Sequence, residues 1–242
     1  MNNGAEHQRG GIGRFLTETA EWNALMCSMA FFFIFTAFGT VQNYATSLPG
    51  NSGAISLAIL YLVLTFSNIF IPAIAGCMSP RWAMFLGSAT YAMYVAANIH
   101  EVDEILYIAA GIMGLGAALL WVAQGSFITQ CSNEYEKKYG LPKNSQLGYY
   151  NGLFWAWMVA NQAVGNGLAA LLFYFDTAKW IVYVVFTSIN VGGVCVFLLI
   201  RPFDSDQPNG PQRNESVQSH SDYRKIEGNV AVQHNDMLNH DV

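Results

Sequence analysis

Amide side chains inside uncharged, apolar stretches are the residues of this sequence with the most distinctive potential for chemistry. Seven of them stand out: Gln42, Asn43, Asn68, Gln124, Asn151, Gln162 and Asn166. An amide donates and accepts hydrogen bonds while it stays neutral, so it can bind a polar solute or a polar group of another protein. Lipid offers such a group no partner. Two interpretations stay open: the amides line a pathway or contact a partner protein, or they only bond to neighbouring helices.

Residues 147–173 would carry several of these side chains on one helix. At about 100° per residue, Asn151, Trp155, Gln162 and Asn166 fall within about 60° of one another. This stripe should face protein or a water-filled cavity. A second stripe consists of small residues, which let another backbone approach closely: Gly148, Gly152, Ala156, Ala160, Ala163, Gly167 and Ala170. The sequence therefore predicts a central packing helix with a polar margin.

Pro72 is expected to disturb a second helix. Proline removes the hydrogen bond normally given to the carbonyl four residues earlier, which here belongs to Asn68. One backbone acceptor and one amide side chain are then free at the same depth. We expect a kink at Pro72, with either a small polar site or hydroxyls such as Thr65 and Ser67 that replace the lost bond.

The distribution of charge identifies the elements that must position these residues. Asp, Glu, Lys and Arg are absent from residues 22–80, 105–133, 144–175 and 180–200. A bilayer core takes about 20 apolar residues per helical pass, and a central charge is costly. With turn and polar segments as boundaries, six spans are expected: 25–47, 54–78, 82–99, 105–128, 147–173 and 180–200. A content of 53% hydrophobic and 11% charged residues agrees with an all-α membrane protein.

Basic residues predict the orientation of these spans. A cytoplasmic N-terminus places seven of them inside and only Lys179 outside; the seven are Arg9, Arg14, Arg81, Lys137, Lys138, Lys143 and Arg201. This bias follows the positive-inside rule. We therefore expect a multi-pass protein of the plasma membrane or an endomembrane, with both termini in the cytoplasm. Its parts would be an N-terminal segment (1–23), a membrane domain (24–201) and a tail (202–242).

The tail is polar and has few large apolar residues, so it is expected to be disordered. Within it, Tyr223-Arg-Lys-Ile226 matches the Tyr-x-x-bulky-apolar pattern that clathrin adaptors bind. The alternative is a solvated tail with one tyrosine.

Several kinds of site are not indicated by the sequence. The expected spans contain no charged residue, so they offer no obvious proton relay or ion-pair coupling site. No paired carboxylates, activated nucleophile or phosphate-binding glycine loop suggests an enzyme. The four cysteines (Cys27, Cys77, Cys131 and Cys195) lack metal-ligand spacing, and no basic stripe suggests nucleic acid. We expect no catalytic role, metal or other cofactor.

The fourth expected span resembles a signature of the uncoordinated-93 (Unc-93-like) family. It reads Gly114-Leu-Gly-Ala-Ala-Leu-Leu-Trp121-Val-Ala-Gln124-Gly125, with Gly114, Gly116, Trp121, Gln124 and Gly125 as the motif residues. Phe38-Gly39-Thr-Val-Gln42-Asn43 and Asn151-Gly-Leu-Phe are similar to other parts of that family. The resemblance covers about residues 25–200. It implies the N-terminal six-span half of a major facilitator superfamily fold, in which each half is a 3+3 inverted repeat.

The sequence departs from the wider superfamily in one loop and in length. Transporters of the superfamily usually carry Gly-x-x-x-Asp-Arg/Lys-x-Gly between spans two and three. Here Gly76 and Arg81 fit, but Pro80 replaces the Asp and Ala83 replaces the second Gly, so the usual charge lock is degraded. Family members have about twelve spans, two six-span halves. The chain would therefore be a truncated or alternative product, or would pair with another half or with itself.

The resemblance implies two functions of different classes. In the first, the protein is a non-catalytic accessory that regulates a potassium channel or escorts a membrane receptor, and the absence of charge in the spans favours it. In the second, the protein is half of a small-molecule transporter whose seven amides face a central pathway, and the amide stripe favours that interpretation.

Overall fold

The computed structural model describes residues 18–47, 51–100 and 102–203. The chain divides into two units, Met1–Arg201 and Pro202–Val242. Most of the second unit lies outside the described residues, and so do Tyr223 and Ile226 of the expected sorting motif. Every described helix belongs to the first unit.

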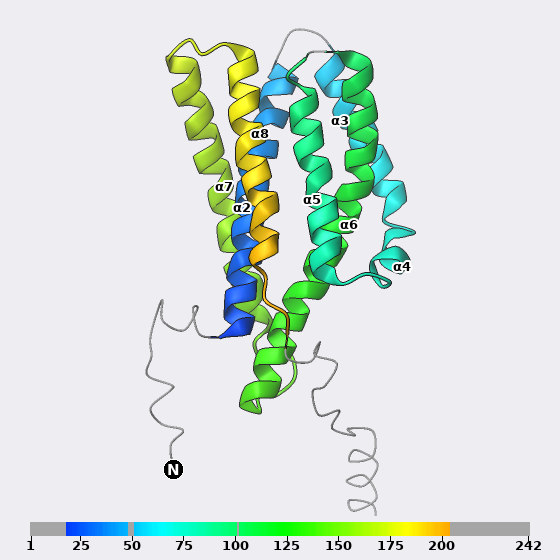
Figure 1. The fold of residues 1–242 in the computed structure, drawn as a ribbon, viewed down its shortest axis with the longest axis vertical. Coiled ribbons are helices and arrows are strands. Elements are labelled where there is room, and N and C mark those ends of the chain that lie inside the picture. Colours follow the sequence, from blue (N-terminus) through cyan, green and yellow to red (C-terminus); the bar gives the residue numbers. More distant parts are fainter. Residues whose placement is uncertain (1–17, 48–50, 101, 204–242) are drawn as a thin grey trace, which may run out of the picture. The chain divides into compact units, whose positions relative to one another are not determined.

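The described part of the first unit consists of helices and their connections, without a strand. In chain order the helices are α2 (Thr19–Ser47), α3 (Ser52–Ser67), α4 (Ile71–Ala75), α5 (Pro80–Ala97), α6 (Asp103–Tyr139), α7 (Leu147–Tyr174), α8 (Lys179–Val196) and the 3-10 helix η1 (Phe197–Leu199). The long helices alternate in direction: α2, α5 and α7 ascend in Figure 1, and α3, α6 and α8 descend. Short connections favour this antiparallel arrangement of neighbours.

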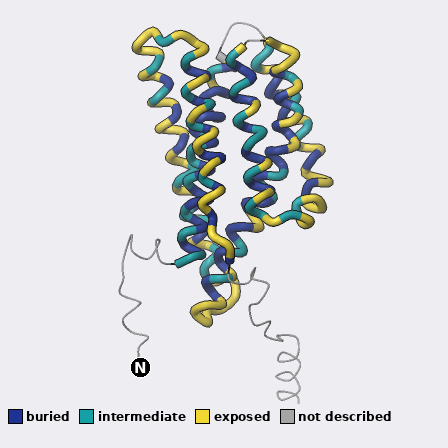
Figure 2. The backbone as a smooth tube through the Cα atoms, in the orientation of Figure 1, coloured by how far each residue is buried: buried dark blue, intermediate teal, exposed yellow. Residues whose placement is uncertain are grey.

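Helix α2 holds the bundle together. It packs against α7 and α8 and also contacts α3, α5 and α6. Its Phe31 ring contacts Trp121 of α6, Phe154 of α7 and Phe197 of η1, with ring centroids 5.5, 5.0 and 6.1 Å apart. Such aromatic pairs contribute about 0.5–1.5 kcal/mol each beyond the burial of their area. Figure 2 shows the buried residues concentrated in the middle of the bundle and the exposed ones on its outer helices.

Gly165 permits the close approach of α7 to α2. A Cβ atom at this position would lie 2.8 Å from the carbonyl oxygen of Thr36 and would also collide with the Thr40 hydroxyl. Both threonines belong to α2. A residue without a side chain is therefore needed at this contact.

The second expected span is interrupted rather than continuous. Helix α3 ends at Ser67, a turn follows over residues 68–70, and α4 begins at Ile71 with Pro72 in its first turn. The Asn68 side chain donates to the Leu64 carbonyl oxygen at 2.9 Å, one helical turn before it. Proline fits the first turn of a helix because the missing N–H has no partner there.

Helix α6 continues beyond the expected span 105–128 to Tyr139. Gly140 ends it with a left-handed backbone conformation (φ 63°). The buried Glu136 carboxylate accepts hydrogen bonds from the backbone N–H groups of Asn144 and Gln146 and from the Ser132 hydroxyl, each 2.8 Å long. Burial raises the pKa of Glu136, but these hydrogen bonds and Lys143 outweigh it and hold the pKa below its ordinary value. The carboxylate thus fixes the connection between α6 and α7.

A pair of hydrogen bonds ties the first long helix to the end of the last one. The buried Asn23 side chain accepts from the Arg201 N–H at 2.8 Å and donates to the Arg201 carbonyl oxygen at 2.9 Å. Beside it, the Trp22 indole N–H donates to the Leu199 carbonyl oxygen at 3.0 Å. These contacts close the bundle at the lower end of Figure 1, where α2 begins and η1 ends.

Three described helices are long and apolar enough to cross a membrane: Thr19–Thr46, Asp103–Tyr139 and Lys179–Leu199. Helix α3 is a shorter apolar helix because the break at residues 68–70 cuts it off. Long apolar helices of this kind identify an integral membrane protein. The described part of the chain thus has three helices that meet these limits, against the six spans expected from the sequence.

Charged residues lie at the two ends of the bundle. The lower end of Figure 1, where α5 and α7 begin and α6 ends, has Arg81, Lys137, Lys138, Lys143 and Arg201. The upper end, where α6 and α8 begin, has Lys179 with Asp103, Glu104 and Asp176. Five of the six described basic residues therefore lie at the same end.

Candidate functional site

Four of the seven predicted amides come together on one face of the bundle. Asn43 of α2 donates to the Oδ1 atom of Asn166 of α7 at 3.4 Å. Gln42, the neighbour of Asn43, accepts from the Tyr61 hydroxyl of α3 at 3.2 Å. We call the surface formed by Gln42, Asn43, Gln162, Asn166 and Tyr61 the amide face.

Gln162 of α7 completes the amide face by lying over α2. A Cβ atom added to Gly39 would lie 2.8 Å from the Gln162 Nε2 atom, so the glutamine side chain occupies the space above that glycine. Gln162, Asn43 and Asn166 are exposed in the first unit. The face therefore presents neutral donors and acceptors to whatever covers it.

Tyr61 is the member of this face that the amide pattern missed. The side chain is 45% exposed on α3, and its ring carries a hydroxyl that both donates and accepts. It lies within the expected span 54–78, and no role was predicted for it. Only the contact with Gln42 on a different helix shows its position.

The remaining three predicted amides lie elsewhere. Asn68 bonds to the Leu64 carbonyl at the break between α3 and α4, and Asn151 donates to the Leu147 carbonyl oxygen at 2.9 Å. Gln124 is buried on α6. Among the described residues, no hydrogen bond joins any of these three to the amide face.

An aromatic surface continues the exposed side of α7. Trp155 is 53% exposed and stacks on Trp121 of α6, with ring centroids 6.3 Å apart. Trp121 in turn meets the edge of Phe35 of α2 at 5.3 Å. Trp155 thus exposes its ring on the stripe that also carries Gln162 and Asn166.

The other motif residues of the fourth span have different surroundings. A Cβ atom on Gly114 would lie 2.7 Å from the Leu60 carbonyl oxygen of α3, and one on Gly116 would collide with the Thr90 side chain of α5. Both glycines are therefore helix contacts. Gly125 has open space where its side chain would be.

The small-residue stripe of α7 is open. All seven of its members are exposed, and a Cβ atom on Gly148, Gly152 or Gly167 would meet nothing within 4 Å. At 3.6 residues per turn, Gly167 points about 200° away from Gly165, the glycine that packs on α2. The predicted close-approach surface is thus separate from the packing of α7 inside this unit, and α2 rather than α7 is the central helix.

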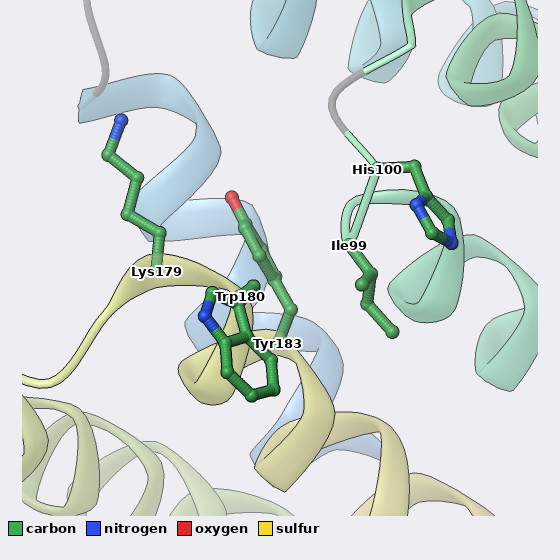
Figure 3. Close-up of a pocket in the computed structure, with 5 residues that line it drawn as sticks. All are labelled: Ile99, His100, Lys179, Trp180 and Tyr183. Atoms are coloured by element: carbon green, nitrogen blue, oxygen red, sulfur yellow. The ribbon is translucent and has the colours of Figure 1, made fainter.

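The described residues form a hollow at the upper end of the bundle. It is a cavity of about 490 Å³ between the end of α5 and the start of α8, lined by Ile99, His100, Lys179, Trp180 and Tyr183 (Figure 3). It shares no residue with the amide face. The described residues contain no group of three or more His, Cys, Asp or Glu that could hold a metal ion.

Comparison with known proteins identifies relatives of this chain. The model of a family described as ion channel regulatory protein UNC-93 matches residues 45–238. UNC93-like protein 3 of Arabidopsis thaliana is 30% identical over 190 residues, which are 76% of this chain and 41% of that protein. UNC93-like protein MFSD11 of Xenopus laevis is 32% identical over 209 residues, 81% of this chain and 44% of that protein.

A relative with a more specific name comes from Caenorhabditis elegans. The putative potassium channel regulatory protein unc-93 of that organism is 28% identical over 155 residues, which are 62% of this chain and 22% of that protein. The chain spans less than half the length of each of these three relatives.

Proposed function

The chain belongs to the UNC-93 family of ion channel regulatory proteins, and on that premise we propose that it is a membrane-embedded accessory protein that regulates or escorts a channel. The named relative from Caenorhabditis elegans makes a potassium channel the first partner to test. A membrane receptor is the second. In this role the chain binds its partner through helices and carries out no reaction on it.

The observation that carries this proposal is the exposed surface of α7. A side chain added at any of the three glycines of its small-residue stripe would have no neighbour within 4 Å, and the amide face lies along the margin of the stripe. Small residues let a second helix approach closely, and amides bond across helices in lipid for about 0.6 kcal/mol on average. A partner helix laid on this surface would satisfy both features.

The proposed topology has six passes with both termini in the cytoplasm, as in one half of a major facilitator superfamily fold. The alternating helix directions and the five basic residues at the lower end support it. Glycosylation mapping tests it: an acceptor site inserted near Asp103 is expected to be modified and one near Lys138 is not. The reverse pattern would overturn the topology.

Co-expression with potassium channel subunits tests the accessory role. The full chain is expected to co-purify with the channel and to change its current. Gly167→Leu, which fills the open stripe, is expected to abolish both effects. The matched control is Gly192→Leu on α8, where a side chain would also meet nothing within 4 Å. If the two variants behave alike, the open stripe of α7 is not the contact surface, and if no channel co-purifies, the role as a potassium channel accessory fails.

Transport of a small neutral solute is the second candidate. The grouping of Gln42, Asn43 and Asn166 with Tyr61 favours it, because these side chains offer hydrogen bonds to a ligand without a charge. Uptake by the unchanged chain is compared with uptake after Asn166→Leu and Gln162→Leu. If the unchanged chain and the two variants all show only background uptake, with folding intact, this role is contradicted.

A further inference from the structure

The lower end of the bundle presents a pair of arginines beside an apolar surface. Arg81 lies in the first turn of α5, and its Nη2 atom donates to the Leu198 carbonyl oxygen of η1 at 2.9 Å. Arg201 follows η1, and its guanidinium lies 4.4 Å from the centre of the Trp22 ring. Both cations are thus positioned around the same short segment, residues 198–201.

The charge of Arg81 is not balanced by the chain around it. A guanidinium has five N–H donors. In the described part of the protein, the Arg81 guanidinium donates one hydrogen bond, and its acceptor is a neutral carbonyl oxygen. No described acidic side chain forms an ion pair with Arg81. Its Nε atom is buried without a partner. Two of the acidic groups at this end have other partners: Glu18 pairs with Lys138 at 2.6 Å, and Glu136 binds the α6–α7 connection.

The side chains next to Arg81 are apolar and exposed. Trp82 is 50% exposed, and the centre of its ring lies 5.7 Å from the Cζ atom of Arg81. Leu198 and Leu199 are 46% and 56% exposed. Tryptophans are enriched at the level of lipid headgroups, with their rings in the interface. A guanidinium at the same level, above exposed leucines, matches a phosphate headgroup above its acyl chains.

We propose that the segment formed by Arg81, Trp82 and residues 198–201 is a binding site for the headgroup of an anionic phospholipid. The phosphate accepts hydrogen bonds from the Arg81 guanidinium, and Arg201 adds a second positive charge. The acyl chains cover Leu198, Leu199 and Trp82. The bound lipid would therefore bridge α5 and the end of α8, and it would stabilise the closure of the bundle near Asn23.

Lipid titration of the purified full chain tests the site. In an uncharged detergent, added phosphatidylserine is expected to raise the melting temperature to a plateau, and phosphatidylcholine is not. Arg81→Gln is expected to weaken the apparent affinity for phosphatidylserine by about tenfold or more, the effect of a lost charged hydrogen bond. The matched control, Lys143→Gln, removes a charge at the same end of the bundle and should bind as the unchanged chain does.

Three results would overturn the proposal. They are equal effects of the two lipids, equal losses in the two variants, and the same stabilisation by inorganic phosphate without lipid, which would assign the site to a free anion. If Arg81→Gln does not fold, the site is tested by crosslinking a photoreactive phosphatidylserine analogue to the unchanged chain. Crosslinks concentrated at residues 81–82 and 198–201 support the site, and crosslinks elsewhere or spread evenly exclude it.

Discussion

Replacing Gly165 by alanine tests the packing of α7 on α2 most directly. The added methyl group would lie 2.8 Å from the Thr36 carbonyl oxygen, and a backbone atom inside a helix cannot move aside as a side chain can. Overpacking of this kind costs about 1–3 kcal/mol. Alanine also gains about 1 kcal/mol over glycine in a helix, which offsets part of the loss. The net loss of unfolding free energy is expected to be about 0–2 kcal/mol.

Gly167→Ala is the control because it makes the same chemical change two residues away. Its methyl group would meet nothing within 4 Å, so the helix-propensity gain stands alone. The difference between the two variants then isolates the steric cost, about 2 kcal/mol. Unfolding of the purified chain in mixed micelles, followed by circular dichroism, measures both. Equal free energies of unfolding for the two variants would refute the proposed contact between α2 and α7.

Three further predictions concern the lower end of the bundle, the α6–α7 connection and the core. Asn23→Ala removes both bonds to Arg201 and leaves the N–H and carbonyl groups of Arg201 without these partners, so it is expected to lower the unfolding free energy by about 2 kcal/mol. The same assay with Asn151→Ala, which loses only a local bond, should show a much smaller change. Glu136→Gln should reduce the acid sensitivity of the fold. Because the pKa of Glu136 is lowered, its ionised form stabilises the native state above the ordinary carboxyl pKa, and this stability is lost as the pH falls through the lower native pKa. Melting temperatures that change with pH in parallel for the two proteins would contradict this role. Phe154→Ala removes a fully buried ring at the junction of α2, α6 and α7 and is expected to cost about 3–5 kcal/mol in the same unfolding assay, whereas Trp155→Ala on the exposed side should cost far less.

The charge-free stretches located the helices well, and they did so for a physical reason. A segment inside the bilayer cannot contain unpaired charge, so the charge-free stretch 144–175 predicts the helix that begins at Leu147. The end of α2 at Ser47 lies within a longer charge-free stretch and was predicted from the turn residues that follow it. The helix ends outside the apolar region were harder to predict. Helix α6 runs to Tyr139 through charged residues, because outside the bilayer a helix tolerates charge and ends where Gly140 supplies a left-handed turn.

The candidate site was only partly predictable. Helical periodicity groups Gln162 with Asn166 because both lie on one helix, but it cannot pair either with a residue of another helix. The contacts of Asn166 with Asn43 and of Tyr61 with Gln42 depend on how α2, α3 and α7 pack. Periodicity also found the small-residue stripe of α7, but not that a single glycine on the opposite side makes the contact with α2.

The geometry of α7 separates the two proposed functions by experiment. Gly165 faces α2, so angles around the axis of α7 are measured from it. Gln162 and Asn166 then lie at about 60° and 100°, and Gly167 lies at about 200°. A solute bound by the amides would touch α2, α3 and α7 and would leave the far stripe uncovered. A partner helix seated on the stripe would touch α7 alone at Gly167 and reach the amides only at its edge. Gly167→Leu should therefore remove channel binding without any effect on solute uptake. Asn166→Leu should lower solute uptake more than it lowers channel binding. A variant of Gly167 that lost both activities, with helix content and melting temperature unchanged, would contradict this separation.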